Sequence, residues 1–242
     1  MEAPALELLP DADFSRILCV VAHPDDVEYG TSAAVAAWTA HGVQVTYLLL
    51  TAGEAGMQRP PAETGPLREA EQREACRIVG VEDLRILDHP DGMLVYSLDL
   101  RRDITRVIRQ VRPDAVVTGD WAVELGWGLN QADHRAAGLA CLDAVRDADN
   151  TWVFPELAAT GGLQKWATRW LLVAGSREPT HGVDVSGQPL ERGIASLEAH
   201  RDYLADIPGH PAPRDLIRGM TAAGGEALGV ANAVLFRAHR LR

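Results

Sequence analysis

Cysteine is scarce in this chain, which has 3 cysteines in 242 residues. Cys19, Cys76 and Cys141 lie far apart, and each falls inside a stretch that we expect to be a strand or a helix. Free cysteines in such places usually behave as small buried apolar side chains. The spacing therefore supports neither a disulfide framework nor a zinc site built from cysteines.

Long hydrophobic runs are also missing. No apolar stretch approaches the roughly 20 residues that a membrane-spanning helix needs. Residues 1–10 carry Glu2 and Glu7 and lack both a basic start and a long apolar stretch, so we expect no secretory signal. These two absences predict a cytoplasmic protein.

Positive charge is in short supply. The chain has 23 Lys and Arg against 34 Asp and Glu, a formal net charge of -11. Such a charge repels phosphate backbones and anionic lipid surfaces, so we expect neither nucleic acid nor a membrane as a partner. A small neutral or basic molecule is easier to accept, and a homo-oligomer is compatible with the composition.

Short apolar runs alternate with helical stretches along the first two thirds of the chain, and no linker rich in serine and glycine divides it. The expected strands are 17–22, 43–50, 84–87 and 115–118, and the expected helices are 29–41, 67–79, 97–111 and 132–146. This alternation predicts an α/β fold with a parallel sheet and helices on both faces. We expect one domain over residues 1–242, a surface loop over 54–66 and a helix over 189–204.

The segment His23-Pro24-Asp25-Asp26 directly follows the first expected strand. Open α/β sheets bind their ligands at this end of the strands. A catalytic zinc site takes three protein ligands and keeps one position open, and the segment offers two in His23 and Asp26. Among the other histidines, His134 stands out because it opens a helix after the fourth strand. Taken alone, the segment is also typical of an ordinary turn in which Asp25 or Asp26 caps a helix.

Further motifs follow in order along the chain. They are Ala22-His23-Pro24-Asp25-Asp26-x-Glu28-x-Gly30, Thr51-x-Gly53-Glu54, Arg68-x-x-Glu71, Pro90-Asp91-Gly92, Arg112-Pro113-Asp114, Asp133-His134-Arg135-Ala136-Ala137 and Val183-Asp184-Val185. The ordered set resembles the LmbE-like or PIG-L-like zinc-dependent de-N-acetylases. The resemblance implies a Rossmann-like three-layer sandwich with a mostly parallel sheet and an active site at the C-terminal ends of its strands.

The resemblance also implies roles for individual residues. His23, Asp26 and His134 correspond to the metal ligands, and Asp25 corresponds to the base. Zinc is the expected metal, with another divalent ion such as Fe²⁺ as an alternative. Members of the family remove N-acetyl groups from compounds that contain glucosamine, so the expected partner is a small N-acetylated molecule.

The chain departs from the family pattern at Gln131, which stands where the family usually has a histidine. A neutral amide cannot act as a general acid, but its N–H groups can still bind a developing oxyanion. Asp25 can in principle return the proton that it takes from water. His200 is a candidate for compensation, either as a proton donor or as a group that stabilises the tetrahedral intermediate; the alternative is an ordinary surface histidine.

Several other residues have two interpretations. His89 follows the third strand and is a second candidate near the site, and Arg68 with Glu71 forms either a surface ion pair or a pair that supports the site. Trp121 and Trp127 offer flat faces for a sugar or for a subunit contact.

The sequence as a whole predicts a metal-dependent hydrolase that removes an N-acetyl or N-acyl group from an amino sugar or a sugar-containing metabolite. One alternative is an amidase that acts on a thiol conjugate or a secondary metabolite. Another is a binding protein that retains zinc and is impaired in hydrolysis by Gln131.

Overall fold

The strand β2 (Arg16–Val21) explains why the sheet is covered on both faces. Successive side chains of a strand point to opposite faces. Ile17 and Cys19 accordingly enter one apolar cluster, and Leu18 and Val20 enter another on the other face. All four are fully buried, so this strand can be accommodated only in the middle of a layered structure.

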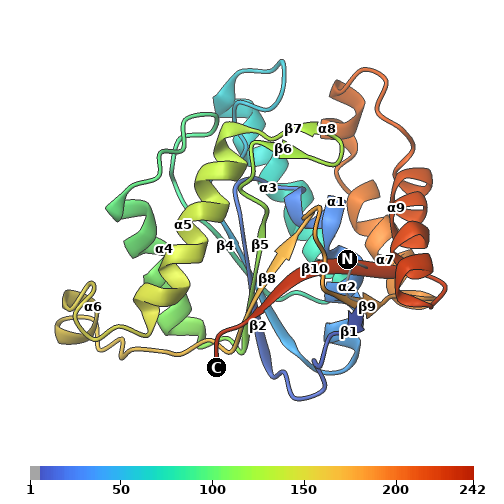
Figure 1. Ribbon diagram of the computed structural model, residues 1–242. Coiled ribbons are helices and arrows are strands. Elements are labelled where there is room, and N and C mark those ends of the chain that lie inside the picture. Colours follow the sequence, from blue (N-terminus) through green and yellow to red (C-terminus); the bar gives the residue numbers. More distant parts are fainter. Residues whose placement is uncertain (1–5) are drawn as a thin grey trace.

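The computed structural model describes residues 6–242 and contains one eight-stranded sheet, drawn in Figure 1. The strand order is β1 (Glu7–Leu8), β9 (His181–Asp184), β10 (Ala233–Arg240), β8 (Trp170–Ala174), β5 (Ala115–Gly119), β2, β3 (Gln44–Leu49) and β4 (Asp83–Ile86). Among the described strands of this sheet, only β10 runs antiparallel to its neighbours. A separate hairpin joins β6 (Glu124–Leu125) to β7 (Gly128–Leu129).

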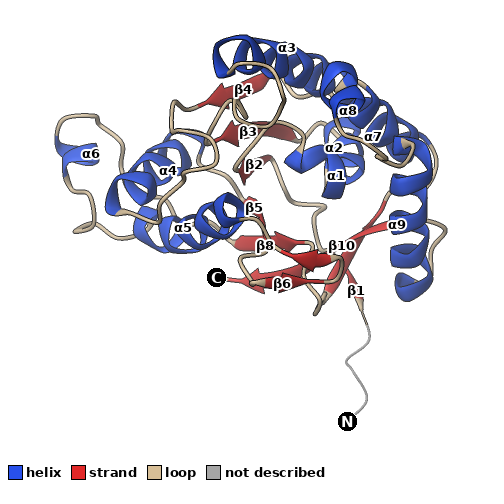
Figure 2. Cartoon of the chain, turned by 90° about the horizontal axis from the view of Figure 1, so that it is seen from above, coloured by secondary structure: helices blue, strands red, loops and turns tan. Residues whose placement is uncertain are grey.

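Helices cover the two faces of this sheet, as Figure 2 shows from above. They are α1 (Asp26–Gly30), α2 (Ser32–Ala40), α3 (Pro61–Val79), α4 (Leu98–Val111), α5 (Ala132–Ala148), α6 (Glu156–Ala159), α7 (Gln188–Glu198), α8 (Arg201–Asp206) and α9 (Pro213–Leu228). The helices α4 and α5 pack on one face, whereas α2 and α3 pack on the other. Within residues 6–242, no helix is both long and apolar enough to cross a membrane.

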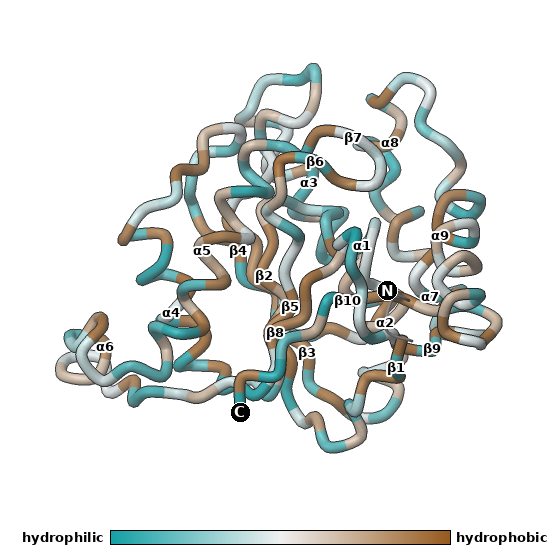
Figure 3. The backbone as a smooth tube through the Cα atoms, viewed as in Figure 1, coloured by the Kyte–Doolittle hydropathy of each residue, from teal (hydrophilic) through white to brown (hydrophobic). Residues whose placement is uncertain are grey.

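The layers follow from the apolar pattern of the sequence. Figure 3 shows hydrophobic residues concentrated along the central strands and more hydrophilic residues on the loops around them. In α4, Leu100, Ile104 and Ile108 recur at a spacing of four residues and are buried against the sheet. The side chain of Ser97 caps this helix by accepting a hydrogen bond from the Leu100 amide. The predicted α/β fold class, a mostly parallel sheet between helices, is confirmed.

The helix expected over 29–41 is divided at Thr31 into α1 and α2. Two other boundaries also differ from the sequence prediction. The expected loop over 54–66 ends early, because α3 begins at Pro61. Proline suits the first position of a helix, where its fixed φ is helical and no N–H is needed. The helix expected over 189–204 is divided between α7 and α8, because His200 leaves the helical conformation with ψ 55° and buries its ring. Both differences lie beside the site described below.

A stability test follows from the close packing of α7 on α2. A Cβ added at Gly193 would lie 2.8 Å from the Cα of Ala33, so Gly193→Ala is expected to destabilise the protein by about 1–3 kcal/mol. Gly219, in α9, has open space around it, and Gly219→Ala should be neutral or stabilising by about 0.5–1 kcal/mol. Urea unfolding of both variants measures the difference. Equal midpoints would contradict the packing argument.

Candidate active site

The candidate site forms where β2 ends and α1 begins. His23 follows the strand, and Asp26 is the first residue of α1. The carboxylate of Asp26 folds back and accepts a hydrogen bond from the amide of His23 at 2.9 Å. Asp25, between them, has φ 82°, in the left-handed region that non-glycine residues rarely adopt. This tight turn directs several polar side chains to the C-terminal edge of the sheet.

His134, in the first turn of α5, joins His23 and Asp26 to form a group that is able to hold a metal ion. One ligand atom from each residue lies within 4.8 Å of the others. Asp26 is 3.0 Å from Nε2 of His134 and 3.6 Å from Nδ1 of His23. Ligand bonds of about 2.0–2.2 Å in a tetrahedral site place the ligand atoms roughly 3.3–3.6 Å apart. The donor types and the spacing therefore fit a divalent metal.

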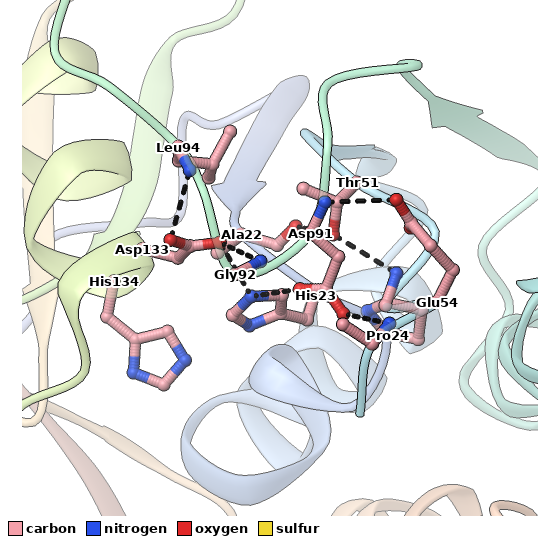
Figure 4. Close-up of polar contacts among 12 residues, drawn as sticks. Ala22, His23, Pro24, Thr51, Glu54, Asp91, Gly92, Leu94, Asp133 and His134 are labelled. Carbon is pink, nitrogen blue, oxygen red and sulfur yellow. Dashed lines mark hydrogen bonds and ion pairs between the residues drawn. The ribbon is translucent and has the colours of Figure 1, made fainter. Parts of the chain in front are cut away.

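A second group, His23 with Asp91 and Asp133, lies on the other side of the same imidazole (Figure 4). Nε2 of His23 is 3.0 Å from Asp91 and 3.4 Å from Asp133. Asp133 also accepts hydrogen bonds from the amides of Gly92 (2.8 Å) and Leu94 (3.1 Å). Carboxylates that are fixed in this way commonly orient a histidine whose other nitrogen binds a metal. We therefore assign them to orientation rather than to a second metal site.

The charges of the cluster favour a cation at its centre. Burial alone lowers the pKa of His23, but hydrogen bonds to Asp133, Asp26 and Asp91 outweigh it and raise that pKa to about 12. Burial likewise opposes ionisation of Asp26, yet His134 and His23 hold the pKa of Asp26 well below its ordinary value. The carboxylates thus stabilise positive charge, which a proton or a metal ion can supply.

Asp25 is held by two residues of α3. The residue is 4% exposed, and its carboxylate accepts a hydrogen bond from Nη2 of Arg68 at 3.0 Å. Its amide donates to Oε1 of Gln72 at 2.9 Å. Burial raises the pKa of Asp25 to about 6, although Arg68 acts in the opposite direction. A carboxylate with a pKa close to neutrality is suited to accept and return a proton at pH 7.

The structure places Gln131 and His200 very differently. Gln131 is the exposed residue before α5, three positions from His134, and its side chain does not cap the helix. His200 is fully buried, and its nearest carboxylate is Glu28 at 3.7 Å. The alternative of an ordinary surface histidine is therefore wrong, and the role expected for His200 as a proton donor or intermediate stabiliser stays a prediction.

The structure also shows the contacts of the other residues that the sequence singled out. His89 pairs with Asp103 at 3.3 Å and does not join the metal-ligand group. The expected pair between Arg68 and Glu71 does not form: Arg68 binds Asp25, whereas Glu71 accepts the Asp202 amide. The two tryptophans differ as well, because Trp121 packs against α5 at Gly138 and Trp127 is 69% exposed on the β6–β7 hairpin.

Tyr203 in α8 is a residue of the site that the sequence analysis missed. The guanidinium carbon of Arg68 lies 3.9 Å from the centre of the Tyr203 ring. The only available signal was its position three residues after His200, at a point where the resemblance to the family is already weak. Gln72 was also missed, because nothing in the local pattern links it to Asp25.

The family model described as GlcNAc-PI de-N-acetylase, PIG-L, matches residues 18–145, which is more than half of the chain. The chain belongs to the PIG-L family. The matched residues include His23, Asp26 and His134, and the family resemblance drawn from the motifs is confirmed.

Curated relatives of this PIG-L protein are named as deacetylases. Diacetylchitobiose deacetylase from Thermococcus kodakarensis is 34% identical over 81% of this chain and 73% of the relative. A 1D-myo-inositol 2-acetamido-2-deoxy-alpha-D-glucopyranoside deacetylase from Geodermatophilus obscurus is 30% identical over 93% of this chain and 81% of the relative. The predicted enzyme class, a deacetylase that hydrolyses a C–N bond, agrees with these names.

Solved structures show the same fold. N,N'-diacetylchitobiose deacetylase from Pyrococcus horikoshii superposes with a TM-score of 0.84 over 96% of this chain and 86% of that chain, at 24% identity. A conserved protein from Thermus thermophilus gives a TM-score of 0.76 over 92% of this chain and 93% of that chain, at 25% identity. The chain therefore shares its fold with these two proteins.

Proposed function

We propose that this protein is a metal-dependent deacetylase that removes the N-acetyl group from an amino sugar or a sugar-containing metabolite. The observation that carries the proposal is the group of His23, Asp26 and His134 beside the buried carboxylate of Asp25. The names of the relatives, which refer to diacetylchitobiose and to a 2-acetamido-2-deoxy-glucopyranoside, support the substrate class.

His23, Asp26 and His134 would hold the metal, with the imidazole of His23 oriented by Asp91 and Asp133. Two nitrogen donors and one carboxylate are typical of catalytic zinc, and the same donors also accept Fe²⁺. When bound, such a metal supplies Lewis acidity, which activates water and polarises the amide carbonyl.

Asp25 would move the protons of the reaction. Its carboxylate takes a proton from the attacking water as the water oxygen bonds to the acetyl carbon. The C–N bond then breaks, and Asp25 returns the proton to the departing nitrogen. The products are acetate and a free amine. The pKa of about 6 given to Asp25 by burial supports both transfers at neutral pH.

Gln131 would act as a hydrogen-bond donor. Its amide is exposed near His134 at the start of α5 and carries two N–H donors. A donor aimed at the developing oxyanion typically contributes about 3–4 kcal/mol to the transition state. This role fits a residue that cannot protonate the leaving amine and leaves that transfer to Asp25.

Metal-dependent release of acetate tests the proposal directly. Purified protein, stripped of metal and then loaded with zinc or iron, is incubated with N-acetylglucosamine, N,N'-diacetylchitobiose and an N-acetylglucosaminyl malate. We expect acetate release only after metal loading, because the attacking water needs activation. Binding of these sugars without acetate release by any metal form would instead favour the alternative of a binding protein.

Separate variants distinguish the base from the ligands. Asp25→Asn keeps a side chain that tolerates the left-handed conformation but removes the carboxylate, so we expect metal content to stay near that of the wild type and turnover to fall by about 10²–10⁴. His134→Ala removes a ligand and should lose metal. Metal analysis and acetate release are measured on both. Full turnover by Asp25→Asn would reject Asp25 as the base.

The donor role of Gln131 has its own test. Gln131→Ala should lower kcat by about 10²–10³ without loss of metal, since one oxyanion donor is removed. Gln131→His restores a ring N–H at the same position and should recover much of this loss. Steady-state kinetics give kcat for each variant, and metal analysis gives its metal content. Unchanged kcat in the alanine variant would exclude Gln131 from the transition state.

A further inference from the structure

The backbone of Asp25 is strained, and the groups that hold it are identifiable. Its φ of 82° is unfavourable for a residue with a Cβ, and such conformations persist only where the surroundings enforce them. Gln72 accepts the Asp25 amide at 2.9 Å. Arg68 donates through Nη2 both to the Asp25 carboxylate at 3.0 Å and to the carbonyl of Pro24 at 2.6 Å. Arg68 therefore fixes the turn and the carboxylate together.

Arg68 is itself tightly enclosed. It is 2% exposed, and its Nη1 donates to the carbonyl of Gly53 at 3.1 Å. A Cβ on Gly53 would lie 2.3 Å from Nη1, and a Cβ on Gly56 would lie 2.6 Å from it. The loop after β3 thus approaches the guanidinium as closely as glycine allows. The ring of Tyr203, 3.9 Å from the guanidinium carbon, packs on its planar face.

We propose that Tyr203 is a positioning residue for the base: its ring, stacked on Arg68, holds the guanidinium against Asp25 and Pro24. The inference rests on the proposed function of Asp25 and adds a residue that acts on Asp25 through Arg68. Arginine stacks well on aromatic faces because its charge is spread over a plane. Without the ring, the guanidinium would be free to move away from the position in which it binds the Asp25 carboxylate.

The helix that carries Tyr203 is attached to the elements around the site. The amide of Asp202 donates to Glu71, which lies one turn after Arg68 in α3, at 2.6 Å. The carboxylate of Asp206 accepts the amide of Gln58, in the loop that precedes α3, at 2.7 Å. These contacts keep α8 over Arg68, although α8 is only 6 residues long.

His200, at the start of α8, lies close to the group that holds the Asp25 amide. Its Nε2 lies 3.7 Å from Oε2 of Glu28, whose Oε1 accepts Nε2 of Gln72 at 3.2 Å. Gln72 in turn binds the Asp25 amide. The segment 200–203 thus contacts Arg68 through Tyr203, whereas His200 lies near the Gln72 side without a hydrogen bond to Glu28. Burial also raises the pKa of Tyr203, and the nearby Asp25 carboxylate adds to this, so its phenol stays protonated.

Two substitutions at the same position separate the ring from the hydroxyl. Tyr203→Leu removes the stacking face, and we expect kcat to fall at least about tenfold, with KM and metal content near wild-type values, because the base is misplaced while the metal ligands stay intact. Tyr203→Phe keeps the ring and should retain kcat within about threefold. Tyr96→Leu is the matched control: it removes a ring that lies 6.0 Å from Arg101, in a contact separate from Asp25, and should leave kcat unchanged.

Each outcome decides the proposal. Wild-type kcat in Tyr203→Leu would overturn it, and so would an equal loss in Tyr203→Phe, because the hydroxyl rather than the ring would then matter. If Tyr203→Leu does not fold, Tyr203→Met, which fills similar space without a ring, takes its place.

A second measurement does not depend on turnover. If the wild type releases no acetate, the proposed function fails, and a double-mutant cycle of urea unfolding with Tyr203→Leu and Arg68→Lys still tests the stacking. The contact is supported if the two substitutions change the free energy of unfolding in a non-additive way, since residues that touch are coupled. Additive effects overturn it.

Discussion

The buried ion pair between Arg68 and Asp25 is the contact on which the geometry of the site depends. Removing two charges from water costs several kcal/mol or more, so such a pair is weak evidence for stability, whereas breaking it by removal of one partner costs roughly 3–5 kcal/mol. Here the pair is 3.0 Å long, and both residues are almost fully buried. It also accompanies a left-handed backbone at Asp25, a conformation that costs about 1–3 kcal/mol. The free-energy costs of the buried pair and of the strained backbone are explained if the fold preserves the position of the Asp25 carboxylate.

The metal-ligand group depends on the same edge of the sheet. Because parallel strands end together, residues that follow β2, β4 and β5 along the chain meet at one edge, which brings His134 to Asp26 and Asp91 to His23. The two sides of the His23 ring then have different partners, with Asp26 and His134 on the side of the proposed metal site and Asp91 and Asp133 on the other. The carboxylates behind the ring are fixed by backbone amides, so the imidazole has little freedom to turn.

The sequence was most informative where the chemistry is local. The segment after the first strand, the helix start at His134 and the alternation of strands and helices could be predicted, and the fold class and the family were confirmed. The partners of Arg68 could not be predicted, because Asp25 lies 43 residues away and Tyr203 is brought over the guanidinium only by the break between α7 and α8. That break occurs because His200 is buried against Glu28, a tertiary contact that helical periodicity does not contain. The single domain over residues 1–242, the identity of the metal and the roles of Asp25 and Gln131 stay predictions.

Gln131 and the confinement of Asp25 are connected by the proton balance of amide hydrolysis. The leaving nitrogen must gain a proton, and a glutamine amide has none to give at neutral pH. In the proposed mechanism, Asp25 therefore serves two positions, the attacking water and the departing nitrogen, with one carboxylate. A displacement of about 1 Å can cost a factor of about 10² in rate, so a base with two tasks has narrow tolerance for movement. Arg68 at the carboxylate and Gln72 at the amide provide that restraint, and Tyr203 packs on the guanidinium of Arg68. In the proposed mechanism, the glutamine at position 131 thus makes the tight hold on Asp25 necessary for both proton transfers.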